Sequence, residues 1–70
     1  MRPSLLKPNQ TVQYHGLCGR FPVKFVERAA ADAGRPACNY FQADKFKTAD
    51  DPKGIIKLRD DEVMRFIDPF

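Results

Sequence analysis

The 70-residue sequence contains no tryptophan, one histidine and two cysteines, so it has few of the side chains that carry covalent or metal-assisted catalysis. A Cys-His nucleophile pair would need a third group to orient the base, and no motif supplies one. The sequence also lacks a glycine-rich phosphate loop. We therefore expect a protein that is not an enzyme and that needs no cofactor.

The soft metal ligands are equally few. His15 and Cys18 have the spacing of half a zinc site, and Cys38 could add a third ligand. The fourth would have to be a carboxylate such as Asp44, which is uncommon in structural zinc sites. The alternative is that the two cysteines behave as small hydrophobic residues, and we expect no metal on this ground.

Long hydrophobic runs are missing as well. The apolar run near the start ends after Leu5 and Leu6, and no stretch approaches the ~20 apolar residues of a membrane span. The sequence therefore predicts no secretion signal and no contact with a membrane. We expect a cytoplasmic protein whose cysteines are reduced.

The composition is that of a folded domain. Hydrophobic residues make up 43% of the chain and charged residues 30%, and a chain of this length forms one domain with a thin stability margin. The net charge of +3 is unevenly spread, because residues 1–47 carry a balance of +5 and residues 48–70 a balance of −2. Such a layout bears on the choice of partner rather than on the fold.

Alternation of apolar and polar residues predicts four strands after an extended N-terminal arm over residues 1–10. Turn signals separate the strands, at Gly16–Gly19 and at Asp50–Gly54. The connection over residues 29–36 is either one helical turn ended by Gly34 or a flexible loop. The predicted strands cover Thr11–His15, Arg20–Arg28, Ala37–Ala43 and Gly54–Arg59.

Residues 60–67 fit two structures. As a helix, Asp60 would be the N-cap, and Val63, Phe66 and Ile67 would share one face. As a strand, Asp60 and Asp61 would form the turn of a hairpin that begins at Ile55. We favour the strand, because it completes a compact hairpin.

These elements predict a mainly β fold: a small SH3-like barrel or a curved antiparallel sheet of four to five strands, with room for one short helix. The segment Gly19–Val26, a glycine turn followed by a basic and apolar strand, resembles the SH3-like and KOW-type small barrels. This resemblance in pattern covers residues 10–68 and implies a fold but no residue roles. A single small β domain is expected over residues 11–70, and the expected core consists of Phe21, Val23, Phe25, Phe41, Ile56 and Leu58.

Cationic side chains supply the candidate binding site. Arg20, Lys24 and Arg28 have even spacing and should share one face of their strand, and Lys57 and Arg59 recur on a later strand. If the two strands are neighbours, one surface carries five cations that could grip phosphates or an acidic protein patch. The alternative is an ordinary solvated strand face. The candidate residues are Arg20, Lys24, Arg28, Arg35, Lys57 and Arg59.

Two further features have ordinary explanations. Tyr14 and Tyr40 could stack on bases, but in a small β domain tyrosines more often lie at the edge of the core. The acidic run Asp60–Glu62 could bind a hard cation, yet it lacks the alternating oxygen ligands of a calcium loop.

Together these observations predict a binding module that docks on a protein partner. By analogy with other small stand-alone domains, we expect a phage- or plasmid-type regulator of host transcription or nucleic-acid machinery. The second hypothesis is direct binding of DNA or RNA by a basic strand face. The acidic C-terminal third and the modest net charge favour the first.

Overall fold

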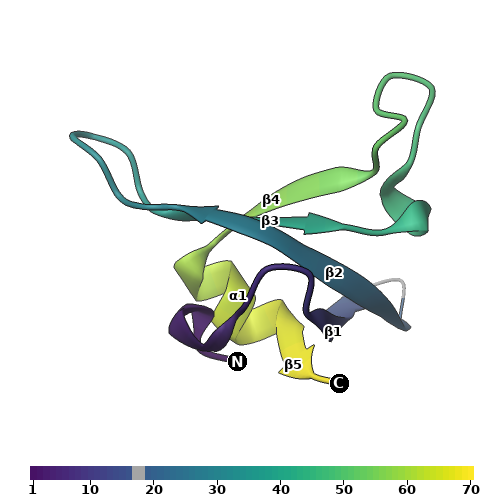
Figure 1. Cartoon of the computed structure of the whole chain (residues 1–70), viewed down its shortest axis with the longest axis horizontal. Helices are drawn as coiled ribbons and strands as arrows, with labels where there is room; N and C mark the ends of the chain where they lie inside the picture. Colours follow the sequence, from purple (N-terminus) through teal and green to yellow (C-terminus); the bar gives the residue numbers. More distant parts are fainter. Residues whose placement is uncertain (17–18) are drawn as a thin grey trace.

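The computed structural model describes residues 1–16 and 19–70. Five antiparallel strands form one sheet in the order β4-β3-β2-β1-β5, and a single helix links the two edge strands (Figure 1). No helix in these residues is long and apolar enough to cross a membrane. The elements are η1 (Pro3–Leu5), β1 (Thr11–Gly16), β2 (Gly19–Ala29), β3 (Cys38–Gln42), η2 (Asp44–Phe46), β4 (Ile55–Arg59), α1 (Asp60–Phe66) and β5 (Ile67–Pro69), where η marks a 3-10 turn.

The mainly β class predicted from the sequence is confirmed, in its open form. Hydrogen-bonded pairing ends at β4 on one side and at β5 on the other, so the described strands form an open sheet and not a closed barrel. The strand number and the single short helix also agree with the expectation. The predicted turn at Gly16–Gly19 includes residues 17 and 18, which lie outside the described residues.

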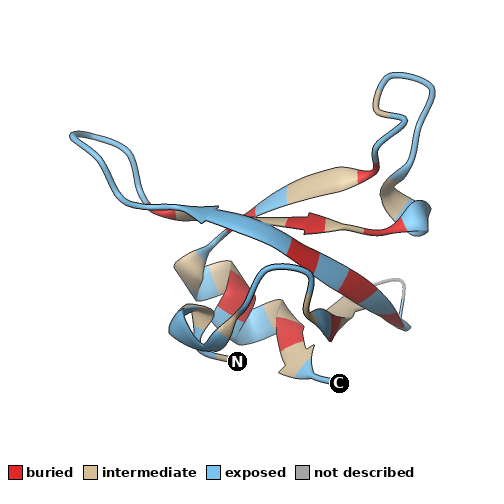
Figure 2. Ribbon diagram, viewed as in Figure 1, coloured by how far each residue is buried: buried red, intermediate tan, exposed pale blue. Residues whose placement is uncertain are grey.

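One face of the sheet, which we call the inner face, packs against α1. Phe21, Val23 and Phe25 of β2 alternate toward this face and are buried (Figure 2). Five of the six predicted core residues are buried, and Ile56 is partly buried against them. The sequence-based core omitted Val12, Ala43, Val63 and Ile67, which are also buried in it.

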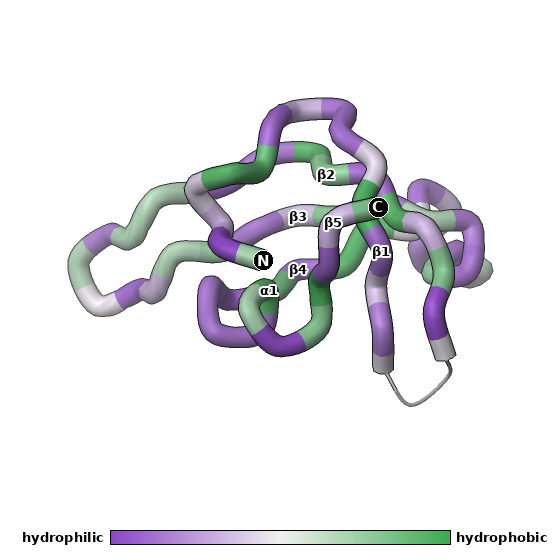
Figure 3. Tube along the Cα trace, turned by 90° about the horizontal axis from the view of Figure 1, so that it is seen from below, coloured by the Kyte–Doolittle hydropathy of each residue, from purple (hydrophilic) through white to green (hydrophobic). Residues whose placement is uncertain are grey.

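Residues 60–66 form a helix, so the favoured prediction of a second hairpin strand is wrong. A strand would have placed Arg65 on the same side as Val63 and Ile67. The helix instead buries Val63 and leaves Arg65 exposed, and Ile67, the first residue of β5, is buried directly after the helix ends. Three carboxylates lie in its first turn, where the helix dipole favours negative charge. Figure 3 shows α1 starting with hydrophilic residues and continuing into hydrophobic ones.

The connection between β2 and β3 extends the hairpin and does not form a helical turn. Asp32 and Arg35 pair through two backbone hydrogen bonds of 3.1 and 2.8 Å, and Gly34 between them has a positive φ of 75°. That φ requires the freedom of glycine. The hairpin projects from the body of the molecule (Figure 1).

The N-terminal segment lies against the sheet and the helix. The Asn9 N–H donates to the carbonyl of Phe25 at 2.9 Å, and the Phe25 N–H donates to the carbonyl of Gln10 at 2.8 Å. Met1 and Leu6 pack against the core, whereas Leu5 stays 60% exposed. The segment therefore covers part of the inner side and leaves the opposite face of the sheet open.

Candidate functional site

The face of the sheet turned away from α1, which we call the outer face, carries most of the predicted site residues. Cross-strand partners share a face, so the register assigns each side chain. Lys24 lies beside Gln42, Tyr40 lies beside Lys57, and Cys38 lies beside Arg59. The ionisable side chains of the outer face, cysteine and tyrosine aside, are His15, Arg20, Lys24, Glu27, Lys57, Arg59 and Asp68.

A β-bulge turns Arg28 away from the strand face that it was predicted to share with Arg20 and Lys24. Phe25 pairs with Phe41, but Glu27, not Val26, pairs with Tyr40, so Val26 is an extra residue. The extra residue reverses the alternation. Arg28 then lies opposite Asn39 on the inner side, and Glu27 takes a place on the outer face. The prediction that Arg28 shares a face with Arg20 and Lys24 is therefore wrong.

Arg28 instead holds the start of α1 together with Asn39. Arg28 Nη2 donates to Asp60 Oδ2 at 2.6 Å, and Asn39 Nδ2 donates to Asp60 Oδ1 at 2.8 Å. The hydrogen bonds from Arg28 and then Asn39 lower the pKa of Asp60, and the bond to Asp60 raises the pKa of Arg28. The same Asn39 amide donates to the Leu58 carbonyl at 3.1 Å. We call Arg28, Asn39 and Asp60 the helix clamp, because they join β2, β3 and α1.

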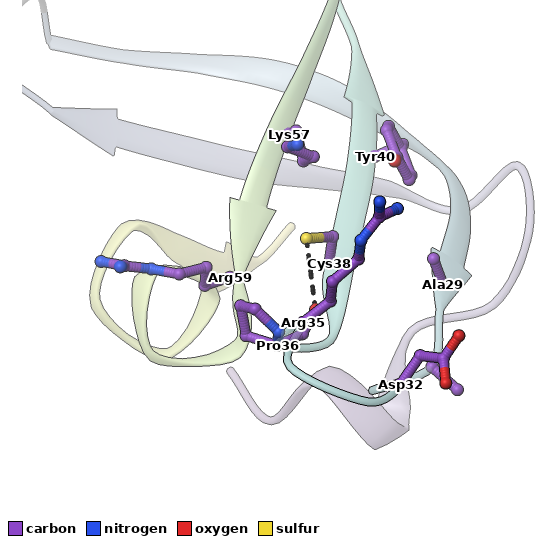
Figure 4. Close-up of a pocket in the computed structure, with 9 residues that line it drawn as sticks. Ala29, Asp32, Arg35, Pro36, Cys38, Tyr40, Lys57 and Arg59 are labelled. Carbon is purple, nitrogen blue, oxygen red and sulfur yellow. Dashed lines mark hydrogen bonds between the residues drawn. The ribbon is translucent and has the colours of Figure 1, made fainter.

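Three predicted cations line one pocket on the outer face, at the base of the β2–β3 hairpin. The pocket has a volume of about 530 Å³ and includes Arg35, Lys57 and Arg59, with Cys38 and Tyr40 between them. In Figure 4, Arg35 extends from the hairpin toward Tyr40, while the Arg59 guanidinium points away from the other side chains. The fold thus brings together residues 22 and 24 positions apart in the sequence.

The charges of these three cations differ in how far they are balanced. Arg59 Nε lies 3.4 Å from Asp61 Oδ1 and 3.4 Å from Glu62 Oε1, so its charge is largely offset. Neither Arg35 nor Lys57 forms an ion pair within residues 1–16 and 19–70. The unbalanced positive charge of the pocket therefore comes from Arg35 and Lys57.

Arg20 and Lys24 lie on the same face but outside this pocket. Both are exposed, and neither pairs with a carboxylate of the described chain. Lys24 lines a smaller hollow with Pro22, Gln42 and Asp44. Because β3 separates β2 from β4, the two groups of cations lie two strand spacings, or ~10 Å, apart across the sheet. They are also offset along the strands, because Lys24 is level with Gln42 and Ile55 and not with Lys57. The strands β2 and β4 are therefore not neighbours, so the five predicted cations do not lie on adjacent strands.

The edge of the sheet at β4 is partly blocked. The Gly54 carbonyl accepts a hydrogen bond from the Ala43 N–H, which follows β3. Because paired and outward-facing backbone groups alternate along an edge strand, the N–H and C=O groups of Ile55, Lys57 and Arg59 face outward. Asp51 Oδ2 accepts the Ile55 N–H at 3.2 Å, and Glu62 Oε1 accepts the Arg59 N–H at 3.0 Å. Of the outward N–H groups only that of Lys57 is left between them, beside the outward carbonyls, so a docking strand would find one free donor there.

The other edge, at β5, is blocked as well. The Ile67 N–H donates to the carbonyl of Val63, and the Ile67 carbonyl accepts from the Met1 nitrogen at 2.9 Å. Pro69 has no N–H to offer. Both edges therefore offer few free N–H groups to a docking strand, and the outer face is the alternative surface.

The metal and thiol hypotheses gain no support from the geometry. Within the described residues, no three His, Cys, Asp or Glu side chains are grouped to hold a metal. Cys18 lies outside them. Cys38 Sγ donates weakly to the Pro36 carbonyl at 3.6 Å. His15 Nε2 lies 3.0 Å from Asp68 Oδ2 rather than near a thiol of the described chain.

Sequence reasoning missed the helix clamp and the bulge. Asn39 lies within the predicted strand Ala37–Ala43 and is missing from the predicted core, although its side chain is fully buried. A signal for the bulge was present: Phe25 and Val26 are adjacent apolar residues, which breaks the alternation that precedes them. Comparison with protein-family models, with curated proteins and with solved structures finds no match to this chain.

Proposed function

We propose that this protein is a non-catalytic binding module that docks on an acidic segment of a protein partner through the outer face of its sheet. The observation that carries the proposal is the set of cations on that face without carboxylate partners in the described chain. These cations are Arg20, Lys24, Arg35 and Lys57.

Charge complementarity indicates the chemistry of the partner. The carboxylates of the acidic run Asp60–Glu62 are engaged with Arg28 and Arg59 and leave the four cations available. A segment rich in Asp or Glu would supply the missing counter-charges, and such contacts mainly raise the association rate and select the partner. Tyr40, half-buried between the two groups of cations, offers an aromatic contact near the centre of the surface.

The wider role stays a prediction from the sequence. A phage- or plasmid-type regulator that acts on transcription or nucleic-acid machinery would need a compact docking surface and no catalytic group. The main rival is direct binding of DNA or RNA by the same cations, with Tyr40 as a stacking platform. The two roles differ in ligand and in salt dependence.

The test compares two double variants of equal charge. Arg20→Glu/Lys24→Glu reverses two outer-face cations, and the control Arg2→Glu/Lys7→Glu reverses two exposed cations of the N-terminal segment. Both lower the formal net charge from +3 to −1. Binding of a labelled glutamate-rich decapeptide and of a random single-stranded DNA decamer is measured by fluorescence anisotropy between 50 and 300 mM salt.

We expect the outer-face variant to bind the acidic peptide about tenfold more weakly, since each exposed pair contributes about 0.2–1 kcal/mol and reversal also adds repulsion. The control should bind nearly as the parent does. Equal losses in both variants would show a response to net charge alone and would contradict the proposal. Tighter binding of the DNA, with a log–log salt slope near −2 for three phosphate contacts, would replace it with the rival role.

A further inference from the structure

The pocket at the base of the β2–β3 hairpin is larger than contact with one carboxylate requires. Its volume of about 530 Å³ falls within the ~300–1,000 Å³ typical of sites that enclose a small ligand. Its walls come from the hairpin, β3 and β4, and Arg35 and Lys57 reach it from different elements (Figure 4). Tyr40 lies directly beside Lys57 in the sheet register.

The groups around the pocket match a doubly charged ligand better than a singly charged one. A phosphate monoester carries a charge of about −1.5 to −2 at pH 7 and three acceptor oxygens. Arg35 can donate two parallel hydrogen bonds, Lys57 adds a point charge, and the Tyr40 hydroxyl adds a donor. A carboxylate would leave one of the two cations unmatched.

The acidic side chains nearby do not compete strongly for these donors. Asp32 lines the pocket, but its Oδ1 accepts the Ala33 N–H at 2.7 Å within the hairpin turn. Glu27 flanks Tyr40 on the side opposite Lys57, and its carboxylate repels an anion bound on that side. The favourable position for an anion is therefore between Arg35 and Lys57.

We propose that this pocket binds a phosphorylated side chain of the acidic segment that docks on the outer face. The proposal rests on the docking role above and adds that phosphorylation of the partner strengthens docking. Arg20 and Lys24 then bind the carboxylates of the segment, while Arg35, Lys57 and Tyr40 bind the phosphate. This is the mode in which basic pockets read phosphorylated acidic motifs.

Binding of four probes to the 70-residue chain is followed by ¹⁵N NMR titration. The probes are the peptide Glu-Glu-Glu-Ser-Glu-Glu-Glu, the same peptide with phosphoserine, N-acetyl-O-phosphoserine amide and adenosine monophosphate. We expect the phosphopeptide to bind about tenfold more tightly than the unmodified peptide, because the phosphate adds charge-assisted hydrogen bonds to Arg35 and Lys57 together. Arg35→Ala/Lys57→Ala should abolish this gain, and the matched control Arg2→Ala/Lys7→Ala should keep it.

The probes separate failure of the pocket from failure of the docking role. Equal affinity for the two peptides would overturn the pocket proposal and leave docking intact. If neither peptide binds, the docking role fails. The phosphoserine amide then decides: shifts of the Tyr40 and Lys57 amides would support a phosphate pocket, and unchanged spectra would overturn it. Tighter binding of adenosine monophosphate than of the phosphoserine amide would make a nucleotide the source of the phosphate and would also overturn the proposal.

Discussion

Replacing Asn39 by alanine tests the helix clamp. The side chain is fully buried and donates two hydrogen bonds, one to the Leu58 carbonyl at 3.1 Å and one to Asp60 at 2.8 Å. The neutral bond should contribute about 1 kcal/mol. The bond to a carboxylate would usually contribute more, but the Asp60 side chain is 40% exposed, so screening reduces it to about 1–1.5 kcal/mol.

One part of Asn39 opposes this stabilisation. Its Oδ1 is buried without a hydrogen-bond partner among the described residues, and removing that atom should return about 1 kcal/mol. The cavity left by the amide adds a cost of similar size. We therefore expect Asn39→Ala to lower the free energy of unfolding by about 2 kcal/mol, against a total of about 4–10 kcal/mol for a domain of this length. Urea denaturation followed by circular dichroism measures the change.

A double-mutant cycle shows whether the clamp acts as described. Asn39→Ala and Asp60→Ala should be coupled by about 1 kcal/mol, since each removes the same hydrogen bond. Asn39→Ala and Asp61→Ala should be additive, because Asp61 pairs with Arg59 instead. Coupling with Asp60 below about 0.3 kcal/mol would contradict the helix clamp, since it would mean that the 2.8 Å contact contributes nothing to stability.

Three further predictions concern stability. Phe25→Ala should lower the free energy of unfolding by about 3–5 kcal/mol, and a urea midpoint equal to that of the parent would show that the inner face is wrongly assigned. Arg28→Glu should lower the urea midpoint, because it puts a second carboxylate beside Asp60, whereas Arg20→Glu should leave it nearly unchanged; equal effects would contradict the bulge. The lowered pKa of Asp60 stabilises the fold above the unfolded pKa of about 3.9, and this contribution is lost as the pH falls through the folded pKa. Between pH 5 and 3, Asp60→Asn should therefore lose less stability than the parent, and parallel pH curves would count against the clamp.

The first half of β2 was predictable because its residues alternate strictly between apolar and polar or proline positions. Phe21, Val23 and Phe25 face one side, and the buried residues confirm that inner face. Residues 60–67 were misassigned because both structures satisfy the local pattern. The choice depends on Val63 packing into the core from the helix and Ile67 from the strand that follows it, which is a tertiary effect that sequence alone does not show.

The candidate site was predictable only in part. The sequence identified all the cations, but their grouping depends on the single extra residue at Val26, which turns Arg28 inward. The pocket depends on the hairpin that carries Arg35 to the same place as Lys57, 22 positions along the chain. Neither the inward turn of Arg28 nor the place of Arg35 follows from residue spacing within one strand. The single cationic surface expected from the sequence is therefore divided into two separate groups.

Chemical-shift mapping of the parent protein with the glutamate-rich decapeptide, in 150 mM salt, tests the docking surface most directly. We expect the largest shifts on amides of residues whose side chains lie on the outer face, including Lys24, Gln42 and Lys57. We also expect the amides of Leu5 and Met64, two exposed apolar residues in η1 and α1, to stay unchanged. If the largest shifts fall on η1 and α1, or if the random DNA decamer competes the peptide off at equal concentration, docking of an acidic protein segment on the outer face is contradicted.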